Sequence, residues 1–245
     1  MRWTGWDVLV WPARFIYLAA MNANGEPNPP ARVLIVDDHP LFRQGLGQLI
    51  DHEPGLKVCG EAKDAEEAMR LVRESKPDLV IVDISLGGSS GIDLIKNLKS
   101  EDAELPLLVV SMHDESLYAE RALRAGAMGY VMKHEPPKTV KTAIHRVLAG
   151  EMYFSEKMAS SLIAKLVRGG EGRDESPVSR LSDRELEVFR LLGEGKGRRD
   201  IAQELSLTLT TINSFSARIK EKLHLKNSAE LLLYAVRWVQ EQARK

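Results

Sequence analysis

An apolar run over residues 79–82 ends at a carboxylate, Asp83, and this junction constrains the fold more than any other stretch. The run is mostly β-branched, which is typical of a strand buried on both faces of a parallel sheet. A loop of small residues, 86–91, and a helical pattern, 92–98, follow it. In open α/β sheets ligands bind at the carboxyl ends of the strands. Asp83 is therefore placed for chemistry, with a helix-capping or turn role as the alternative.

The same alternation of strand-like and helix-like segments recurs from residue 32 to residue 150. Strands are expected over residues 33–36, 56–61, 79–83, 105–111 and 127–133, and helices over 40–50, 65–73, 92–98, 115–125 and 136–150. Asp64 is the expected N-cap of the second helix, and Gly126 the residue that ends the fourth. Five strand–helix units in series predict an α/β, doubly wound five-stranded parallel sheet, flavodoxin-like in class.

The remainder of the chain differs in class from this α/β part. Residues 153–167 predict a connecting helix, residues 168–177 form a polar, glycine-rich linker, and every segment from Leu181 onward is helical. The expected domains are an N-terminal extension (1–30), the α/β domain (31–150), the helix and linker (151–176) and a small all-α domain (177–245). The extension is expected to be disordered, with translation starting at Met21 as a hypothesis.

Composition and charge fit two domains with different partners. The 245 residues carry a net charge of −1, but residues 177–245 hold 13 Lys and Arg against 9 Asp and Glu. The single cysteine, Cys59, excludes an internal disulfide and fits a reducing compartment, and it is interpreted as a small core residue. The longest apolar segment, 8–20, is interrupted by Pro12 and Arg14 and is too short to span a membrane. A cytoplasmic protein with no membrane partner is expected.

Polar side chains stand at four strand ends of the predicted sheet. They are Asp37 and Asp38 after the first strand, Asp83 after the third, Ser111 at the end of the fourth and Lys133 at the end of the fifth. In a parallel sheet these ends converge on one edge, and crowded carboxylates call for a cation. Mg²⁺ is the natural choice because it is held by carboxylates, water and phosphate oxygens. With Lys133 and Ser111 to contact a phosphoryl group, the set predicts phosphoryl transfer to a carboxylate.

The all-α region has the pattern of a helix-turn-helix. Ser182 and Glu185 form a capping box at its first helix, and a short helix (200–205), a tight turn and a longer helix (210–223) follow. In this arrangement the longer helix enters the major groove of DNA. Its core-facing side is predicted to comprise Ile212, Phe215, Ile219 and Leu223.

The opposite side of that helix carries small and polar residues and one arginine, which suits close approach to base edges. The candidate DNA contacts are Thr210, Thr211, Asn213, Ser214, Ala217 and Arg218 on the helix, with Lys196, Arg198, Arg199, Lys220 and Lys222 as candidates for phosphate contacts. The alternative is a four-helix interaction module with a solvated basic rim, which would bind a protein partner.

Residues 32–150 resemble the receiver domain of two-component response regulators. The resemblance rests on Asp37-Asp38, Asp83, Ser111 and Lys133, with a tyrosine, Tyr130, three residues before the lysine. It implies that Asp83 is the phosphoacceptor charged by a histidine kinase, and that Mg²⁺ is the cofactor.

The resemblance also implies roles for the neighbours of Asp83. Asp38, Asp83 and the Ser85 backbone carbonyl would ligate Mg²⁺ directly, and Asp37 would act largely through water. Tyr130 would turn inward when Ser111 moves toward the phosphoryl group. Ser85 and His113 stand at positions that tune phosphoryl lifetime in the family. Gly87 replaces a proline that is frequent in the family, which loosens the loop but removes no ligand.

Residues 181–231 look like a LuxR-type DNA-binding domain, so the whole chain resembles regulators of the NarL/FixJ class. The residues that carry this likeness are Arg184, Glu185, Ile201, Ala202, Leu205, Thr211, Ile212, Ile219, Lys222, Leu223, Glu230 and Leu231. Two positions depart from the family, because Asn213 replaces a usual lysine and Phe215 a usual histidine. The first departure removes a phosphate contact, so altered specificity or a smaller salt dependence of DNA binding is expected.

The resemblance implies a transcriptional response regulator that forms a homodimer when phosphorylated and binds paired half-sites in double-stranded DNA. No turnover of a separate substrate is expected. The alternative is a receiver whose helical domain binds a protein. A phosphatase of the aspartyl-phosphate type is a weaker third reading, because Ser85 stands where a second catalytic acid is needed.

Overall fold

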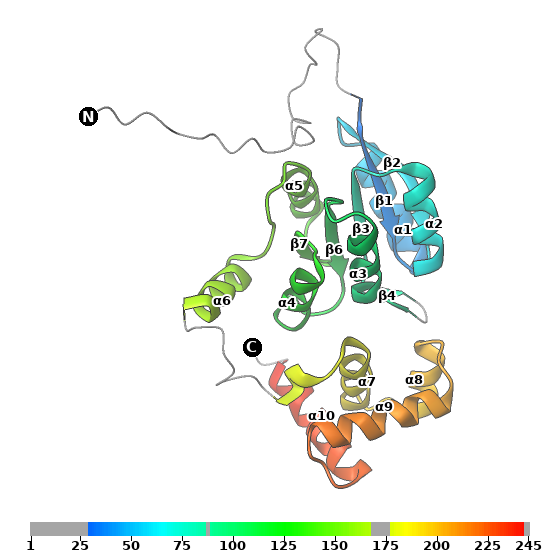
Figure 1. Cartoon of the computed structure of the whole chain (residues 1–245), viewed down its shortest axis with the longest axis vertical. Coiled ribbons are helices and arrows are strands. Elements are labelled where there is room, and N and C mark those ends of the chain that lie inside the picture. Colours follow the sequence, from blue (N-terminus) through cyan, green and yellow to red (C-terminus); the bar gives the residue numbers. More distant parts are fainter. Residues whose placement is uncertain (1–28, 87–88, 168–176, 243–245) are drawn as a thin grey trace, which may run out of the picture.

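The computed structural model describes residues 29–86, 89–167 and 177–242 (Figure 1). The predictions made for the extension up to residue 28, for Gly87 and for the linker over 168–176 lie outside the described residues.

A five-stranded parallel sheet forms the centre of the first part of the chain, as the sequence predicts. The strands are β1 (Ala31–Val36), β2 (Leu56–Ala62), β3 (Leu79–Val82), β6 (Leu107–Ser111) and β7 (Gly129–Met132). Their order is β2-β1-β3-β6-β7, and every pairing is parallel. Between β3 and the next helix, where a loop was expected, two short antiparallel strands form, β4 (Ser85–Leu86) and β5 (Ser89–Ser90).

Five helices cover both faces of this sheet. They are α1 (Pro40–Asp51), α2 (Ala65–Ser75), α3 (Gly91–Glu101), α4 (Glu115–Ala125) and α5 (Pro137–Leu148). Helices α1 and α5 pack on one face, and α2, α3 and α4 on the other (Figure 1). Asp64 caps α2 by accepting from the Glu67 amide at 2.9 Å, and Gly126 ends α4 with φ 110°, as expected. Leu41, the second residue of α1, is 86% exposed and lies outside the core.

The segment after α5 corrects one prediction. A helix was expected from Tyr153, but this residue forms a parallel bridge to Gly129 beside β7. The Tyr153 amide donates to the Met128 carbonyl at 2.9 Å, and the Tyr130 amide donates to the Tyr153 carbonyl at 2.9 Å. The chain therefore extends the sheet edge briefly before α6 (Glu156–Val167) begins.

The C-terminal part is helical. It comprises the 3-10 helix η2 (Pro177–Arg180), α7 (Asp183–Gly193), α8 (Arg198–Glu204), α9 (Leu209–Lys222) and α10 (Ser228–Gln242). The capping box of Ser182 and Glu185 is present at α7. The predicted sides of α9 are also observed, because Ile212 and Ile219 are buried, whereas Asn213 and Arg218 are exposed. None of the described helices is long and apolar enough to cross a membrane.

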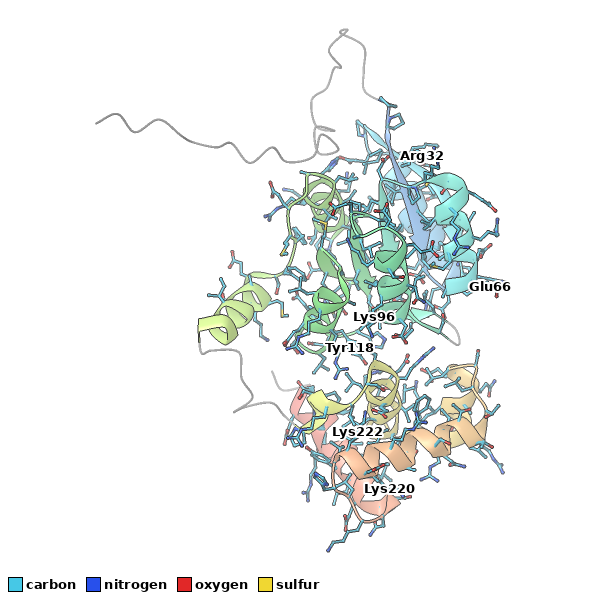
Figure 2. All side chains as sticks on the ribbon, in the orientation of Figure 1. Arg32, Glu66, Lys96, Tyr118, Lys220 and Lys222 are labelled. Atoms are coloured by element: carbon cyan, nitrogen blue, oxygen red, sulfur yellow. The ribbon has the colours of Figure 1, made fainter. Side chains whose placement is uncertain are left out.

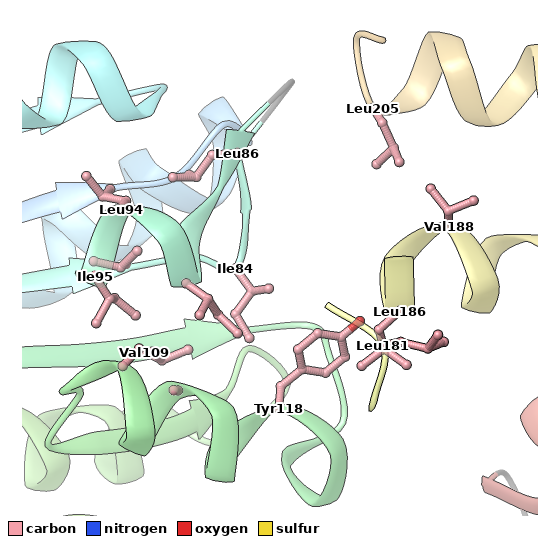
Figure 3. Close-up of a cluster of buried hydrophobic side chains, with 14 of the residues drawn as sticks. Ile84, Leu86, Leu94, Ile95, Val109, Tyr118, Leu181, Leu186, Val188 and Leu205 are labelled. Carbon is pink, nitrogen blue, oxygen red and sulfur yellow. The ribbon is translucent and has the colours of Figure 1, made fainter. Parts of the chain in front are cut away.

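The two parts of the chain are docked in this structure. Tyr118 of α4 is buried and points toward Leu181 and Leu186 at the start of the helical part (Figure 3). Beside this apolar contact, Arg121 donates to Asp183 and to the Leu181 carbonyl, both at 2.8 Å. Lys96 of α3 contacts the same Asp183 at 3.1 Å; Figure 2 shows Lys96 and Tyr118 on the side that faces the C-terminal helices.

Candidate functional site

The predicted polar residues meet at the carboxyl edge of the sheet. Backbone hydrogen bonds hold two of them in register, from the Asp83 amide to the Val36 carbonyl at 2.9 Å and from the Lys133 amide to the Ser111 carbonyl at 2.8 Å. Asp83 is 3% exposed. Helix α3 begins directly against it, since a Cβ on Gly91 would lie 1.9 Å from the Asp83 carbonyl oxygen. A glycine is therefore required there.

Lys133 links the two buried carboxylates. Its Nζ atom lies 2.7 Å from Asp83 Oδ2 and 2.6 Å from Asp37 Oδ2, and it also stands 4.5 Å from the centre of the Phe42 ring. Ser111 Oγ donates to the other oxygen of Asp83 at 2.6 Å. Burial raises the pKa of Asp83, while Lys133 and Ser111 act to lower it. Asp83 is thus a desolvated carboxylate held in one orientation, which is what a nucleophile in phosphoryl transfer needs.

Four residues at this edge could hold a metal ion. Asp37, Asp38, His39 and Asp83 each offer one ligand atom, and these atoms lie within 4.8 Å of one another. The carboxylate oxygens fit the preference of Mg²⁺ for hard ligands. Three of the four were predicted; His39 was not, although it follows Asp38 directly in the sequence, and its Nδ1 lies 2.7 Å from Asp38 Oδ1. Ser85, the other predicted ligand, lies on β4 just beyond Asp83.

The aromatic residue expected to turn inward is already inside. Tyr130 is 2% exposed and donates its hydroxyl proton to the His113 carbonyl at 2.8 Å. In the same arrangement, Ser111 Oγ contacts Asp83.

Ser85 and His113 contact each other and a residue of the helical part. Ser85 Oγ lies 2.7 Å from His113 Nε2, and it donates to Glu187 Oε1 on α7 at 3.3 Å. Burial lowers the pKa of His113 to about 3, helped by the charges of Arg190 and Lys133, so the ring is neutral. Sequence reasoning missed Glu187, because nothing local marks a residue that meets its partner across 102 positions.

The candidate DNA-contact residues lie on one side of the helical part. On α9, Thr210, Asn213, Ser214, Ala217 and Arg218 are exposed, whereas Thr211 is half-buried and its amide donates to the capping Thr208 hydroxyl at 3.1 Å. The outward side of α9 stays exposed while the two parts of the chain are docked.

The candidate phosphate contacts are not equivalent. Arg199 is exposed, and Lys220 is half-buried on α9 (Figure 2). Lys222 Nζ lies 2.6 Å from Glu185 Oε2, and Lys196 Nζ lies 2.7 and 2.6 Å from the two oxygens of Glu204. Both lysines are thus paired with carboxylates of the helical part. Arg198 contacts Asn213 Oδ1 at 3.4 Å and Ser228 Oγ at 2.9 Å.

Two family models match the chain, one in each part. Residues 33–145 match the response regulator receiver domain, and residues 179–235 match the bacterial regulatory proteins of the luxR family.

Full-length relatives share both parts. The oxygen regulatory protein NreC of Staphylococcus haemolyticus (strain JCSC1435) is 33% identical over 84% of this chain and 97% of its own. The nitrate/nitrite response regulator protein NarL of Escherichia coli (strain K12) is 33% identical over 87% of this chain and 96% of its own. RcsB of Salmonella enterica serovar Typhimurium, solved bound to promoter rprA with the phosphomimetic BeF3⁻, is 28% identical over 84% of this chain and 98% of that chain, with a TM-score of 0.56.

Proposed function

This chain belongs to the two-component response regulators that join a receiver domain to a LuxR-type DNA-binding domain, and from that premise we propose which residues carry the signal. Asp83 accepts a phosphoryl group from a histidine kinase. The observation that carries this proposal is a 3%-exposed carboxylate at a strand end, with Lys133 at 2.7 Å and Ser111 at 2.6 Å.

In the transfer step, an Asp83 oxygen forms a bond with phosphorus as the phosphorus–nitrogen bond of the kinase phosphohistidine breaks. Lys133 leaves its contact with Asp83 to pair with the incoming phosphoryl oxygens, and the Ser111 hydroxyl donates a hydrogen bond to them. Water later hydrolyses the aspartyl phosphate, so the protein takes and loses the group on its own side chain with no separate substrate.

The metal that this family implies fits the residues present. Asp38, Asp83 and the Ser85 carbonyl would hold Mg²⁺ directly, with Asp37 acting through water. Mg²⁺ supplies positive charge next to the transferring group, where the carboxylates alone would repel it.

The DNA-binding step belongs to α9, whose outward residues would enter the major groove. The RcsB structure, which holds a promoter and a phosphomimetic together, supports DNA over the alternative of a protein-binding helical domain. Because the outward side of α9 is already exposed in the docked chain, phosphorylation need not uncover it. We infer that phosphorylation reorganises the face around β6 and β7, frees the C-terminal domain and allows two copies to pair on two half-sites.

The proposal also gives the bounds of the domains and the place where the protein acts. The receiver spans residues 31–150 and the DNA-binding domain 177–245, joined by the helix and linker of 151–176. The protein acts in the cytoplasm without a membrane partner.

The experiment that tests this function is a selection of bound fragments from a genomic DNA pool. It is run at one salt concentration, with and without beryllofluoride and Mg²⁺, on the wild type and on Asp83→Asn. Enrichment of a shared, inverted-repeat site only in the activated wild type is the expected result. Enrichment in every sample would support DNA binding but contradict its control by phosphorylation. No enrichment in any sample would favour the protein-binding alternative.

A further inference from the structure

The DNA-binding domain reaches the edge of the phosphorylation site through Glu187. This residue lies on α7, is 5% exposed, and accepts a hydrogen bond from Ser85 Oγ at 3.3 Å. Ser85 stands two positions after Asp83, and its hydroxyl is 2.7 Å from His113 Nε2. The His113 amide in turn donates to Ser111 Oγ at 3.4 Å, and Ser111 contacts Asp83.

The number of protons available decides the direction of these hydrogen bonds. A serine hydroxyl has one proton, and an ionised carboxylate can only accept. Since Ser85 gives its proton to Glu187, its oxygen must accept from His113, which therefore carries its proton on Nε2. In the docked chain, both the Ser85 proton and the His113 Nε2 proton are engaged.

The charge of Glu187 alone would not make the docking of α7 affect the phosphorylation of Asp83. Glu187 Oε2 pairs with Arg184 at 2.7 Å, and the positive charge of Arg190 acts on His113 nearby. The charge of Glu187 is thus balanced within α7, so repulsion of a phosphoryl group is weak. The hydrogen bond is different, because the Ser85 proton can serve only one acceptor at a time.

We propose that Glu187 is a positioning residue for the phosphorylation site, which competes with the phosphoryl group on Asp83 for the hydroxyl proton of Ser85. The inference rests on the proposed phosphorylation of Asp83. When Ser85 turns to the phosphoryl oxygens, Glu187 loses a hydrogen-bond donor in a buried place, and α7 is held less tightly. By linkage, docking of α7 weakens phosphorylation by the same factor in equilibrium terms.

The first test reads the proton on His113 in the full-length chain without any phosphodonor. Long-range ¹H–¹⁵N NMR of the wild type is expected to show His113 protonated on Nε2. In Glu187→Ala, Ser85 is free to donate to His113, and the proton of the ring is expected to move to Nδ1. An unchanged tautomer in a folded Glu187→Ala protein would overturn the proposal. Glu221→Gln, which alters an exposed carboxylate of α9, is the matched control and is expected to match the wild type.

The second test measures the rate of phosphorylation by phosphoramidate and Mg²⁺. Glu187→Ala is expected to raise the rate about threefold to tenfold, the value of one hydrogen bond. In a Ser85→Ala background the same substitution is expected to change nothing, because the contested proton is gone. An equal acceleration in both backgrounds would contradict the competition.

The wild-type tautomer guards against a Glu187 variant that fails to fold. A wild-type His113 ring protonated on Nδ1 would show that Ser85 donates its proton to His113 rather than to Glu187, and the proposal would be wrong. Asp83→Asn gives the background signal of the phosphorylation assay. If the wild type showed no more than this background, the proposed function would be wrong. The His113 tautomer would still test the contact between Glu187 and Ser85.

Discussion

At the scale of single residues, the two buried carboxylates Asp37 and Asp83 depend on Lys133. Their side chains and that of Lys133 are each 3% exposed, and Lys133 Nζ contacts both. Removing one partner of a buried ion pair leaves an uncompensated charge, which costs far more than the pair contributes when intact. Lys133 is also the cation that would pair with the phosphoryl oxygens. The same side chain therefore serves both the stability of the fold and the proposed phosphoryl transfer.

Lys133→Ala is therefore expected to lower the free energy of unfolding by about 3 to 5 kcal/mol. It is also expected to abolish detectable phosphorylation by phosphoramidate. Urea unfolding followed by NMR signals of the sheet measures the first effect. Lys141→Ala is the control, because Lys141 is 36% exposed and its bond to Glu53 lies on the surface; a cost of at most about 1 kcal/mol is expected there. Equal losses in the two variants would contradict this account.

Glu185 joins α7 to α9 through its contact with Lys222. Burial acts to raise the pKa of Glu185, but hydrogen bonds from Lys222 and the Ser182 amide outweigh it, and the net pKa is lowered. A carboxyl whose folded-state pKa is lowered contributes stability above its unfolded pKa, and this contribution is lost as the pH falls through the folded pKa.

Glu185→Gln is accordingly expected to destabilise the helical domain at pH 7 by about 1 to 3 kcal/mol, the worth of a charge-assisted hydrogen bond. The difference from the wild type should shrink as the pH falls through the lowered folded-state pKa of Glu185, because the wild-type carboxyl becomes protonated there too. The indole signal of Trp238, packed on Phe189, reports this unfolding in urea. Glu204→Gln serves as the surface control, and a pH-independent difference for Glu185→Gln would speak against the assignment.

At the scale of elements, α9 is a helix whose two sides have separate tasks. Ile212 and Ile219 are fully buried, whereas Asn213, Ser214, Ala217 and Arg218 are exposed. Lys222, at its C-terminal end, is bound to Glu185 and so contributes to packing rather than offering a free charge. The phosphate contacts of this element should therefore be fewer than its lysine content suggests.

Asn213→Lys restores a charge on the outward side of α9. Each phosphate neutralised steepens the slope of log K against log salt by about 0.9, and that is the expected change, with tighter binding at low salt. Fluorescence anisotropy on a selected DNA fragment, over a series of salt concentrations, measures it. Gln240→Lys adds the same charge at an exposed position of α10; if both variants steepened the slope equally, Asn213 would not face the phosphates.

At the scale of the whole molecule, α3 and α4 of the receiver hold the start of α7. Arg121 spans Asp183 and the Leu181 carbonyl, and its side chain is only 18% exposed. Tyr118 packs against the same turn (Figure 3). This docking fixes the orientation of the DNA-binding domain without covering the outward side of α9. We therefore expect it to restrain the proposed pairing of two copies rather than contact with one half-site.

Arg121→Ala is expected to loosen the docked arrangement without phosphorylation. The radius of gyration measured by small-angle X-ray scattering should rise. Affinity for DNA with two half-sites should increase at least about fivefold, a typical coupling free energy between sites, while affinity for one half-site stays unchanged. Arg124→Ala is the matched control one turn along α4, where the side chain is 71% exposed and pairs with Glu120 in the same helix. A gain for single half-sites would mean that docking hides α9.

The sequence alone determined the α/β architecture, the succession of strands and helices along the chain and the meeting of Asp37, Asp83, Ser111 and Lys133. These follow from short-range patterns, because buried runs, caps and strand ends are set by neighbouring residues, and parallel strands bring their ends to one edge. The capping box of Ser182 and the buried and exposed sides of α9 also follow from patterns among neighbouring residues.

Only the tertiary structure decided which partners the remaining polar groups take. Tyr153 joined the sheet instead of a helix, Lys222 was claimed by Glu185, and Glu187 reached Ser85 across 102 positions. Such contacts depend on how two finished surfaces fit together. Each contact contributes little free energy compared with the apolar burial that forms the domains. The sequence can therefore carry such a contact without any repeated pattern of residues, and only the tertiary structure shows it.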